Sequence, residues 1–392
     1  MLDDNYFEKR ILIGLTIVWL VIHVLLFKYY GIRNLFDAVG YVKGADFLIQ
    51  HGRLIDIHHF FYVVLVGLIA FFRILFPNEI LPYLIFQCLI SGLATLALYK
   101  TASKIFNNRL AGIFSSLIFL FWFDAIKWNM VTMTESLMTS ITCFILFCIT
   151  HFKGSKKEYF RIIILLTTLV FIRPTGVIII FATVIFLIGY NWKHLKNRLV
   201  SKFIVIAGVS IICIGGATLL FTHWDFTSEY ENGNIVTYMN KNEGTELYYE
   251  SLRMQSDDID LAKPETPSIL KVVHFILHNP YYALKTGSLK VWYLVSFIRP
   301  YHSKRHNVYT IAWLMLVYTA FYFGFKNVQA APIRLFVLIV IIANCSLIAI
   351  ATVDWDNRFF MPMEPGIVLL AGGGVSYFYN KLRRYIFSEE QK

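Results

Sequence analysis

Apolar residues occur along this chain in long blocks, separated by short clusters of Lys and Arg. Several blocks reach or approach the ~17–25 residues that a helix needs to cross a hydrocarbon core of about 30 Å. An open strand would leave backbone groups without hydrogen-bond partners in lipid, so the pattern predicts an all-α chain of membrane-spanning helices. The predicted spans, about ten by this length criterion, lie near 11–28, 80–99, 110–123, 135–152, 161–173, 175–190, 203–222, 309–325, 333–352 and 362–379.

The basic clusters occupy every second connection between these spans. By the positive-inside rule they place those connections and both termini in the cytoplasm. The clusters are Lys9 with Arg10, residues 100–109, 153–161 and 193–202, Lys326 with Arg334, and residues 381–384. The fifth and sixth spans meet at Arg173-Pro174-Thr175-Gly176, because proline interrupts a helix and glycine permits a reversal. The alternation of basic connections places this turn on the outer face.

Two further apolar segments are predicted to lie along the outer membrane surface. Residues 58–77 contain Arg73, and counting them as a span would turn the later basic loops outward. Residues 269–297 are interrupted by Lys271, His274, Lys285 and Lys290. We therefore interpret both segments as juxtamembrane helices. The expected division of the chain is an N-terminal transmembrane module, 1–222, with its first outer loop at 28–79, then a large outer region, 223–308, and C-terminal helices, 309–392.

Composition excludes two classes of protein. With 57% hydrophobic and 16% charged residues, the chain is too apolar to be buried in one soluble core. The net charge of +11 comes from basic residues spread between apolar blocks, so topology explains it and no nucleic-acid partner is expected. The five cysteines all fall in apolar segments and suggest no disulfide framework. The first span is expected to be an uncleaved helix.

A short helix is predicted directly after the first span, from Asn34 to a closing Gly52. At 3.6 residues per turn, Asp37, Tyr41 and Ala45 share one face, which brings a carboxylate and a phenol together near the membrane surface. A structural role for Asp37 is also open. Asn34 can cap the helix, and a carboxylate in the first turn suits the positive helix end.

Glu135 is a second carboxylate on the predicted outer face. Thr132-Met133-Thr134-Glu135 has the spacing of a capping box that would open the fourth span. A helix-capping role and a role in a reaction therefore both fit this residue.

These positions, in this order and all on the outer face, resemble the GT-C superfamily of polytopic glycosyltransferases. Within it, the chain looks most like protein mannosyltransferases and lipid A aminoarabinose transferases. The resemblance covers the chain to about residue 180 and the last outer loop. It is carried by Asp37, Tyr41, Ala45, Leu48, Gly52, His58, Thr134-Glu135-Ser136-Leu137, Arg173-Pro174 and Arg358-Phe359-Phe360-Met361-Pro362.

The resemblance implies transfer of a sugar from a polyprenyl-phosphate donor to a hydroxyl of a lipid, glycan or protein acceptor on the non-cytoplasmic face. It implies Asp37 as the general base and Glu135 as the catalytic acidic residue of the second outer loop. In-line attack at the anomeric carbon would expel the lipid phosphate and invert that carbon. The expected location is a bacterial inner or plasma membrane.

No cofactor is assigned from the sequence. Some members of the family carry paired acids where Ala38 follows Asp37 here, and often His-Pro-Pro where this chain has His58-His59-Phe60. No His or Cys spacing defines a zinc site. Any metal ion would then be a hard divalent cation, held by Asp37, Glu135 and phosphate oxygens of the donor.

A phosphate-linked leaving group needs cations to balance its charge. The alternatives are snorkelling or headgroup binding for the outer-face cations, and for Arg358 an ion pair with Asp354 or Asp356. The candidate substrate-binding residues are Tyr41, Lys43, Arg53, His58, Arg73, Arg173, His302, Lys304, Arg305 and Arg358.

Two other functions fit a polytopic chain: a flippase of lipid-linked saccharides, and a polymerase or ligase that transfers a saccharide chain. The middles of most spans are poor in charged residues, whereas carriers often concentrate polar groups there. No glycine-rich phosphate loop is present for a nucleotide-sugar donor. The sequence therefore favours a lipid-linked donor.

Overall fold

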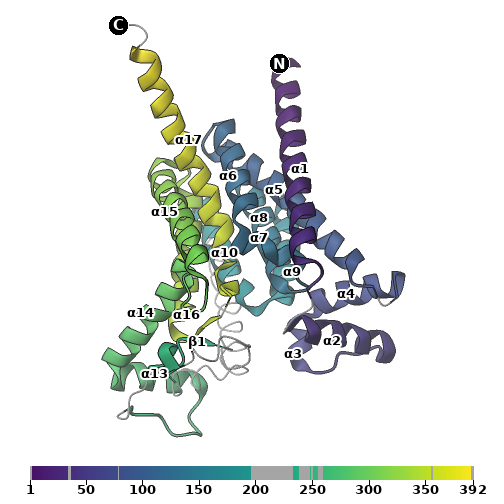
Figure 1. Ribbon diagram of the computed structural model, residues 1–392, viewed down its shortest axis with the longest axis vertical. Coiled ribbons are helices and arrows are strands. Elements are labelled where there is room, and N and C mark those ends of the chain that lie inside the picture. Colours follow the sequence, from purple (N-terminus) through teal and green to yellow (C-terminus); the bar gives the residue numbers. More distant parts are fainter. Residues whose placement is uncertain are drawn as a thin grey trace. The chain divides into compact units, whose positions relative to one another are not determined.

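The computed structural model describes residues 2–33, 37–77, 79–195, 233–237, 248, 250–254, 259–354 and 356–389. Over these residues the chain is mostly helical, with one pair of two-residue strands, which confirms the all-α class (Figure 1). The predicted span at 203–222, part of the predicted outer region at 223–308 and the predicted cap Asn34 lie outside the described residues.

The chain forms two compact units. Unit 1 comprises Met1–Phe186, Val317–Val337 and Glu364–Lys392, and unit 2 comprises Leu187–Leu316 and Leu338–Met363. The division expected along the chain, at 222 and 308, stays a prediction.

Unit 1 contains most of the helices. They are α1 (Leu2–Tyr30), α2 (Asp37–His51), α3 (Ile57–Phe60), α4 (Val63–Leu75), α5 (Leu81–Ile105), α6 (Arg109–Phe121), α7 (Phe123–Ile126), η1 (Lys127–Met130), α8 (Thr134–Thr150), α9 (Lys156–Ile172), η2 (Pro174–Gly176) and α17 (Glu364–Glu389). Three helices have residues in both units: α10 (Val177–Leu195), α15 (Lys304–Asn327) and α16 (Ala331–Ile350).

Small residues set the helix packing of unit 1. A Cβ atom on Gly372 of α17 would lie 2.0 Å from Oγ of Ser115 on α6, and one on Gly374 would lie 1.8 Å from the carbonyl oxygen of Ala320 on α15. Side chains cannot occupy such spaces, so glycine lets α17 approach both helices closely. Without a hydrophobic force between helices in lipid, close packing of this kind is what holds membrane helices together.

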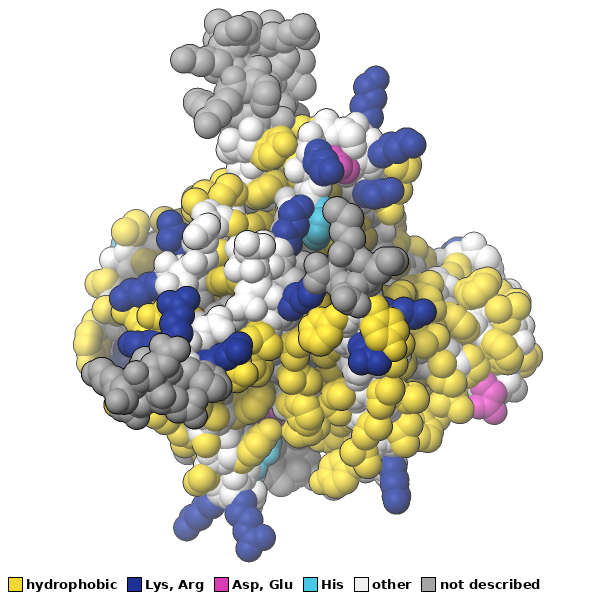
Figure 2. Space-filling view, turned by 90° about the horizontal axis from the view of Figure 1, so that it is seen from above, with side chains coloured by type: hydrophobic (Ala, Val, Ile, Leu, Met, Phe, Trp, Pro, Cys, Tyr) yellow, Lys and Arg dark blue, Asp and Glu magenta, His cyan; other side chains and the backbone are white. Residues whose placement is uncertain are grey.

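The two ends of unit 1 differ in charge. At one end the Arg109 guanidinium at the start of α6 lies 5.7 Å over the Phe7 ring of α1, and a Cβ atom on Gly373 of α17 would meet the Phe106 ring. We call this the basic end, because the predicted cytoplasmic clusters of α1, α5, α6, α9 and α17 gather there. Figure 2, seen from the end at which both chain termini lie, shows many Lys and Arg side chains and few acidic ones.

The number of spans is not confirmed. Within the described residues, four helices are long and apolar enough to cross a membrane: Tyr6–Tyr30, Leu81–Ile105, Lys304–Asn327 and Ala331–Ile350. A fifth is added if Arg109–Phe121 and Phe123–Met130, bent by 61°, count as one span. The α4 helix has 13 residues. At 1.5 Å per residue it is about 20 Å long, too short for a full span, in keeping with the juxtamembrane interpretation of 58–77.

In unit 2, the segment predicted as one juxtamembrane helix over 269–297 is two helices, α13 (Ser268–His278) and α14 (Pro280–Ser296). The chain breaks at Asn279-Pro280, because proline disfavours helical backbone at the residue before it. Unit 2 also contains η5 (Glu250–Leu252), η6 (Arg358–Phe360) and the parallel strands β1 (Val236–Thr237) and β2 (Val353–Asp354), which pair Thr237 with Asp354.

Candidate active site

Asp37 is exposed in the first turn of α2, and the helix buries the face that follows it. Ala38, Tyr41 and Ala45 are buried there. The helix ends at His51, and Gly52 has φ of +65°, so the predicted glycine closure is confirmed. The carboxylate therefore stands at the edge of a packed surface, where water and a substrate can reach it.

His58 reaches α2 through one intervening ring, that of Tyr62. Its ring lies 4.9 Å from that of Tyr62, which in turn lies 5.1 Å from Tyr41. His59 packs against α2 as well, because a Cβ atom on Gly44 would lie 2.4 Å from its ring. The fold thus brings together two of the candidate substrate-binding residues, Tyr41 and His58.

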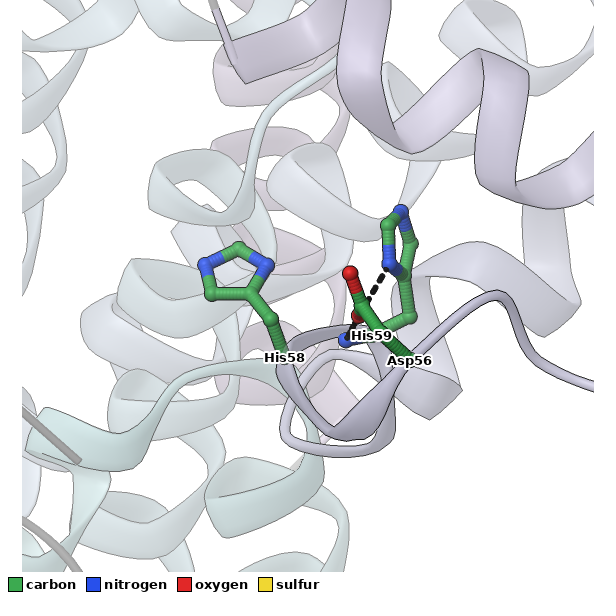
Figure 3. Close-up of side chains that lie close together, drawn as sticks. All are labelled: Asp56, His58 and His59. Atoms are coloured by element: carbon green, nitrogen blue, oxygen red, sulfur yellow. Dashed lines mark hydrogen bonds and ion pairs between the residues drawn. The ribbon is translucent and has the colours of Figure 1, made fainter.

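Asp56 and His59 hold the short helix α3. Asp56 caps the helix by accepting the backbone N–H of His59 at 2.9 Å, and Nδ1 of His59 lies 2.7 Å from the same oxygen. These hydrogen bonds from His59 lower the pKa of Asp56. Figure 3 shows the Asp56 carboxylate between the imidazoles of His58 and His59.

Glu135 and Arg173 form a buried ion pair. The Arg173 guanidinium donates to the Glu135 carboxylate and to the hydroxyl of Thr134. Both side chains are almost entirely buried. The capping-box interpretation is wrong, because α8 begins at Thr134 with Met133 as its N-cap and no side chain caps it. Glu135 is thus placed by Arg173, which comes from the predicted outward turn between α9 and α10.

Backbone and ring contacts bring these groups to one end of unit 1. Arg33, four residues before Asp37, pairs as a β-bridge with Val131, four residues before Glu135. Phe60 of α3 packs edge-on against Phe171, at 5.5 Å, two residues before Arg173. We call this the Asp37 end. It is opposite to the basic end, because α1 runs between them from its N-terminus to Tyr30 (Figure 1).

The other predicted cations of this end differ in what they contact. Arg73 forms two hydrogen bonds with Asp46, at 2.6 and 3.4 Å, which join α4 to α2. This pairing favours a structural role over donor binding. Lys43 is exposed, and Arg53 is exposed with its guanidinium 5.9 Å from the Phe47 ring.

A buried polar network behind the Asp37 end was not predicted. The Gln87 side-chain amide donates to the carbonyl oxygens of Trp128, Asn129 and Val131 at 3.0–3.2 Å. Asn129 in turn hydrogen-bonds to His23 and to Ser91, at 2.8 and 2.9 Å, and accepts from Ser136. The network fixes the segment that leads into Glu135. Polar residues inside apolar spans were the available signal.

In unit 2, Arg358 pairs with Asp354. Its Nε lies 2.7 Å from Oδ2 of Asp354, and both side chains are buried. Arg358 therefore forms the ion pair with Asp354 that the sequence offered as an alternative. Binding of donor phosphate by Arg358 stays a prediction. The pair follows the β1–β2 ladder, with Asn357 in the left-handed region at φ of +60°.

Arg299 organises the cations of unit 2 and was missed in the sequence. Its guanidinium donates to the carbonyl oxygens of Tyr293, Ile298 and Asp354 at 2.7–3.1 Å and to the Asn357 side chain. Phe297, with φ of +57°, turns the chain just before it. Left-handed backbone at a bulky residue is costly and is retained where the surroundings impose it.

Residues 301–306 include the candidates His302, Lys304 and Arg305, and we call them the 301–306 cluster. The Asn307 side chain accepts from the backbone N–H of Arg299 at 3.3 Å and donates to its carbonyl at 2.9 Å. Lys304 and Arg305 are exposed at the start of α15, and the rings of His302 and His306 lie 4.4 Å apart. Unit 2 thus brings Arg358 and the 301–306 cluster to the two sides of Arg299.

Two groups of side chains in the described residues have the composition and proximity to hold a metal ion. They are Asp56, His58 and His59 in unit 1, and Asp260, His274 and His278 in unit 2. Neither contains Asp37 or Glu135, so a hard cation on those two carboxylates stays a prediction.

Comparison with known proteins supports the resemblance drawn from the sequence. Residues 59–215 match the family model described as dolichyl-phosphate-mannose-protein mannosyltransferase. A search of curated protein sequences gave no match. The fold is similar to that of the archaeal oligosaccharyltransferase AglB from Archaeoglobus fulgidus, solved in complex with an inhibitory peptide and a dolichol-phosphate, with a TM-score of 0.52 and 12% sequence identity.

The similarity covers 99% of this chain and 52% of the archaeal one, so the chain spans about half the length of that protein. Together, the family match and the shared fold confirm the resemblance to GT-C glycosyltransferases. The matched family is the protein mannosyltransferase branch that the outer-loop motifs resembled.

Proposed function

We propose that this chain transfers a sugar from a polyprenyl-phosphate donor to an acceptor hydroxyl, on the non-cytoplasmic face and with inversion at the anomeric carbon. The observation that carries the proposal is the placement of Asp37. An exposed carboxylate stands beside the segment of the buried Glu135–Arg173 pair, at the end of unit 1 opposite the basic loops. By the positive-inside rule, that end faces away from the cytoplasm.

Asp37 is the general base in this proposal. The acceptor hydroxyl gives its proton to the Asp37 carboxylate while its oxygen bonds to the anomeric carbon. The bond from that carbon to the phosphate oxygen breaks, and the polyprenyl phosphate leaves with the electron pair. Exposure suits this task, because Asp37 must exchange the proton with water after each turnover.

Glu135 acts through Arg173. Its carboxylate is already hydrogen-bonded inside the fold, so it is poorly placed to accept an acceptor's proton. It holds an arginine at the Asp37 end, where a fixed cation stabilises developing negative charge on the leaving phosphate. Tyr41 and His58 form the adjacent wall of the site, toward the sugar or the acceptor.

Lys304, Arg305 and Arg358 are proposed to bind donor phosphate. Lys304 and Arg305 are exposed on α15. The Arg358 guanidinium donates to the Asp354 carboxylate. Arg299 holds the same turn by donating to the Asp354 carbonyl and to the Asn357 side chain. The match to a family named for a dolichyl-phosphate-mannose donor supports a lipid phosphate as the ligand.

The test is the Asp37→Asn variant of the purified chain. The amide has nearly the same shape but cannot take up a proton, so transfer of labelled sugar from polyprenyl phosphate should fall by about 10²-fold or more. Thermal stability should stay near the wild-type value, because an exposed polar residue remains at the helix start.

Asp46→Asn is the matched control, since it changes another carboxylate of α2 that is engaged with Arg73. It should retain most of the transfer activity. Equal transfer by wild type and Asp37→Asn would remove Asp37 from the mechanism. No transfer by wild type from any lipid-linked sugar, together with movement of such lipids across a bilayer, would support a flippase instead.

A further inference from the structure

Helix α13 carries two histidines one turn apart. His274 and His278 share one helical face, and their rings stack at 3.8 Å with an interplanar angle of 15°. Histidines at this spacing on a helix are a recurrent pair of zinc ligands. Nδ1 of His278 lies 2.9 Å from the carbonyl oxygen of His274, to which it must donate. The other nitrogen, Nε2, then keeps its lone pair for a ligand.

A carboxylate from outside the helix completes the cluster. The ligand atoms of Asp260, His274 and His278 all lie within 4.8 Å of one another. The Asp260 backbone is clamped to the residue after His278: its N–H donates to the Asn279 side chain at 3.0 Å, and its carbonyl accepts from the same side chain at 2.8 Å.

Packing supports the same placement of Asp260. Ile259, the residue before it, packs on the buried pair of Phe275 from α13 and Tyr282 from α14. Phe275 is the residue after His274 and is buried. The carboxylate is therefore held beside the two histidines by contacts that do not depend on a ligand.

One nitrogen of the cluster lacks a partner. Among the described residues, Nδ1 of His274 is buried and makes no hydrogen bond. A buried polar atom without a partner is energetically costly. An imidazole in this state, stacked on a second imidazole and close to a carboxylate, points to a ligand that the protein itself does not provide.

We propose that Asp260, His274 and His278 bind a transition-metal ion of the zinc class. Two neutral imidazoles and one carboxylate suit Zn²⁺, whereas Mg²⁺ and Ca²⁺ prefer oxygen ligands alone. Metal–nitrogen bonds of about 2.0–2.1 Å need the three ligand atoms closer together, which rotation of the exposed Asp260 and His278 side chains allows. Water would fill the remaining coordination position.

The ion would fasten the segment before α13 to that helix. This site is separate from the carboxylates assigned to sugar transfer, and it does not depend on the proposed function. Its role is structural, because a metal that binds only the folded arrangement stabilises it.

The test uses the full-length chain in detergent, stripped with a chelator and titrated with Zn²⁺ against a chromophoric competitor. His278→Ala and Asp260→Asn should each weaken binding at this site by at least about tenfold, as loss of an interaction at a metal site typically does. Zn²⁺ should raise the melting temperature of the wild type and raise that of His278→Ala much less.

His51→Ala is the matched control, because it removes an exposed histidine at the end of α2 that belongs to neither cluster, and it should leave Zn²⁺ binding unchanged. Both substituted side chains of the site are exposed, and the metal-free melting temperatures show whether the variants fold. If a variant fails to fold, the visible spectrum of the wild type loaded with Co²⁺ decides. Four-coordinate Co²⁺ with imidazole ligands absorbs strongly in the visible, whereas hydrated Co²⁺ absorbs weakly and would contradict the site. Absence of binding in wild type, or equal binding by wild type and both variants, would overturn the proposal.

Discussion

The two carboxylates that stood out in the sequence have opposite environments. Asp37 is exposed at the start of α2, and Glu135 is buried against Arg173. From sequence alone each could be a helix cap or a catalytic group. The structure removes the cap for Glu135, since Met133 occupies that position. A structural role at the helix start stays open for Asp37, because its predicted capping residue, Asn34, lies outside the described residues.

The buried pair leads to a stability prediction at the residue scale. Glu135→Gln removes one charge and leaves the Arg173 guanidinium buried without its counter-ion. Breaking a buried pair in this way costs about 3–5 kcal/mol. The melting temperature of the purified variant should therefore fall well below that of the wild type.

Asp46→Asn provides the comparison, because the Asp46–Arg73 pair is more exposed. Losing a half-buried pair costs less than losing a buried one, so its melting temperature should fall less than that of Glu135→Gln. Replacing both partners, with Glu135→Leu and Arg173→Met, should recover stability relative to Glu135→Gln. Equal melting temperatures for Glu135→Gln and the wild type would argue against a buried ion pair.

Residue types were easier to predict than their partners. Arg358 was a candidate because it follows an outer helix end, and the sequence already offered Asp354 as its partner. Arg299 was passed over because it lies at the end of an apolar run. Its importance depends on carbonyl groups of residues 293, 298 and 354, and such contacts across the fold leave no spacing signal.

At the scale of elements, hydrophobic blocks located the helices well and their ends less well. The span predicted at 80–99 is the core of α5, and that at 333–352 is close to α16. The helices run past the apolar blocks because polar and basic residues continue them. The break at Asn279-Pro280 was missed, although the residue before proline gave the signal for it.

The Gln87 network gives a prediction at this scale. Gln87→Leu keeps the volume but leaves three carbonyl groups of the segment before α8 without their donor. Each unsatisfied buried group costs about 1–3 kcal/mol, so the melting temperature should fall. The segment should also loosen, and hydrogen exchange of the amides in residues 127–135 should become faster.

Thr95→Val is the control for this prediction. The Thr95 hydroxyl donates to the Ser91 carbonyl of its own helix, at 2.9 Å, so its loss should leave residues 127–135 protected. Unchanged exchange in Gln87→Leu would mean that packing, not the amide, holds this segment.

At the scale of the whole molecule, the sequence predicted which groups share an end. Asp37, His58, Glu135 and Arg173 come from separate segments, and the positive-inside rule alone put them on one side. In unit 1 they gather at the end opposite the basic loops, as the contacts of Val131 and Phe60 require. The arrangement of side chains within that end, including the Glu135–Arg173 pair, needed three-dimensional packing.

The sidedness of unit 1 gives the last prediction. A cysteine at Ile55, which is exposed between α2 and α3, should react with a membrane-impermeant thiol reagent in intact cells. A cysteine at Ser155, exposed at the cap of α9 on the basic end, should react only after permeabilisation. Positive charges resist translocation, so the loop at Ser155 stays inside and the Asp37 end faces out. The four described native cysteines lie buried or half-buried in helices, and the unsubstituted chain measures their background. Labelling at Ser155 with protection at Ile55 would invert the orientation and place the proposed transfer on the cytoplasmic face. The polyprenyl-phosphate donor would then have to present its sugar on the cytoplasmic side of the membrane.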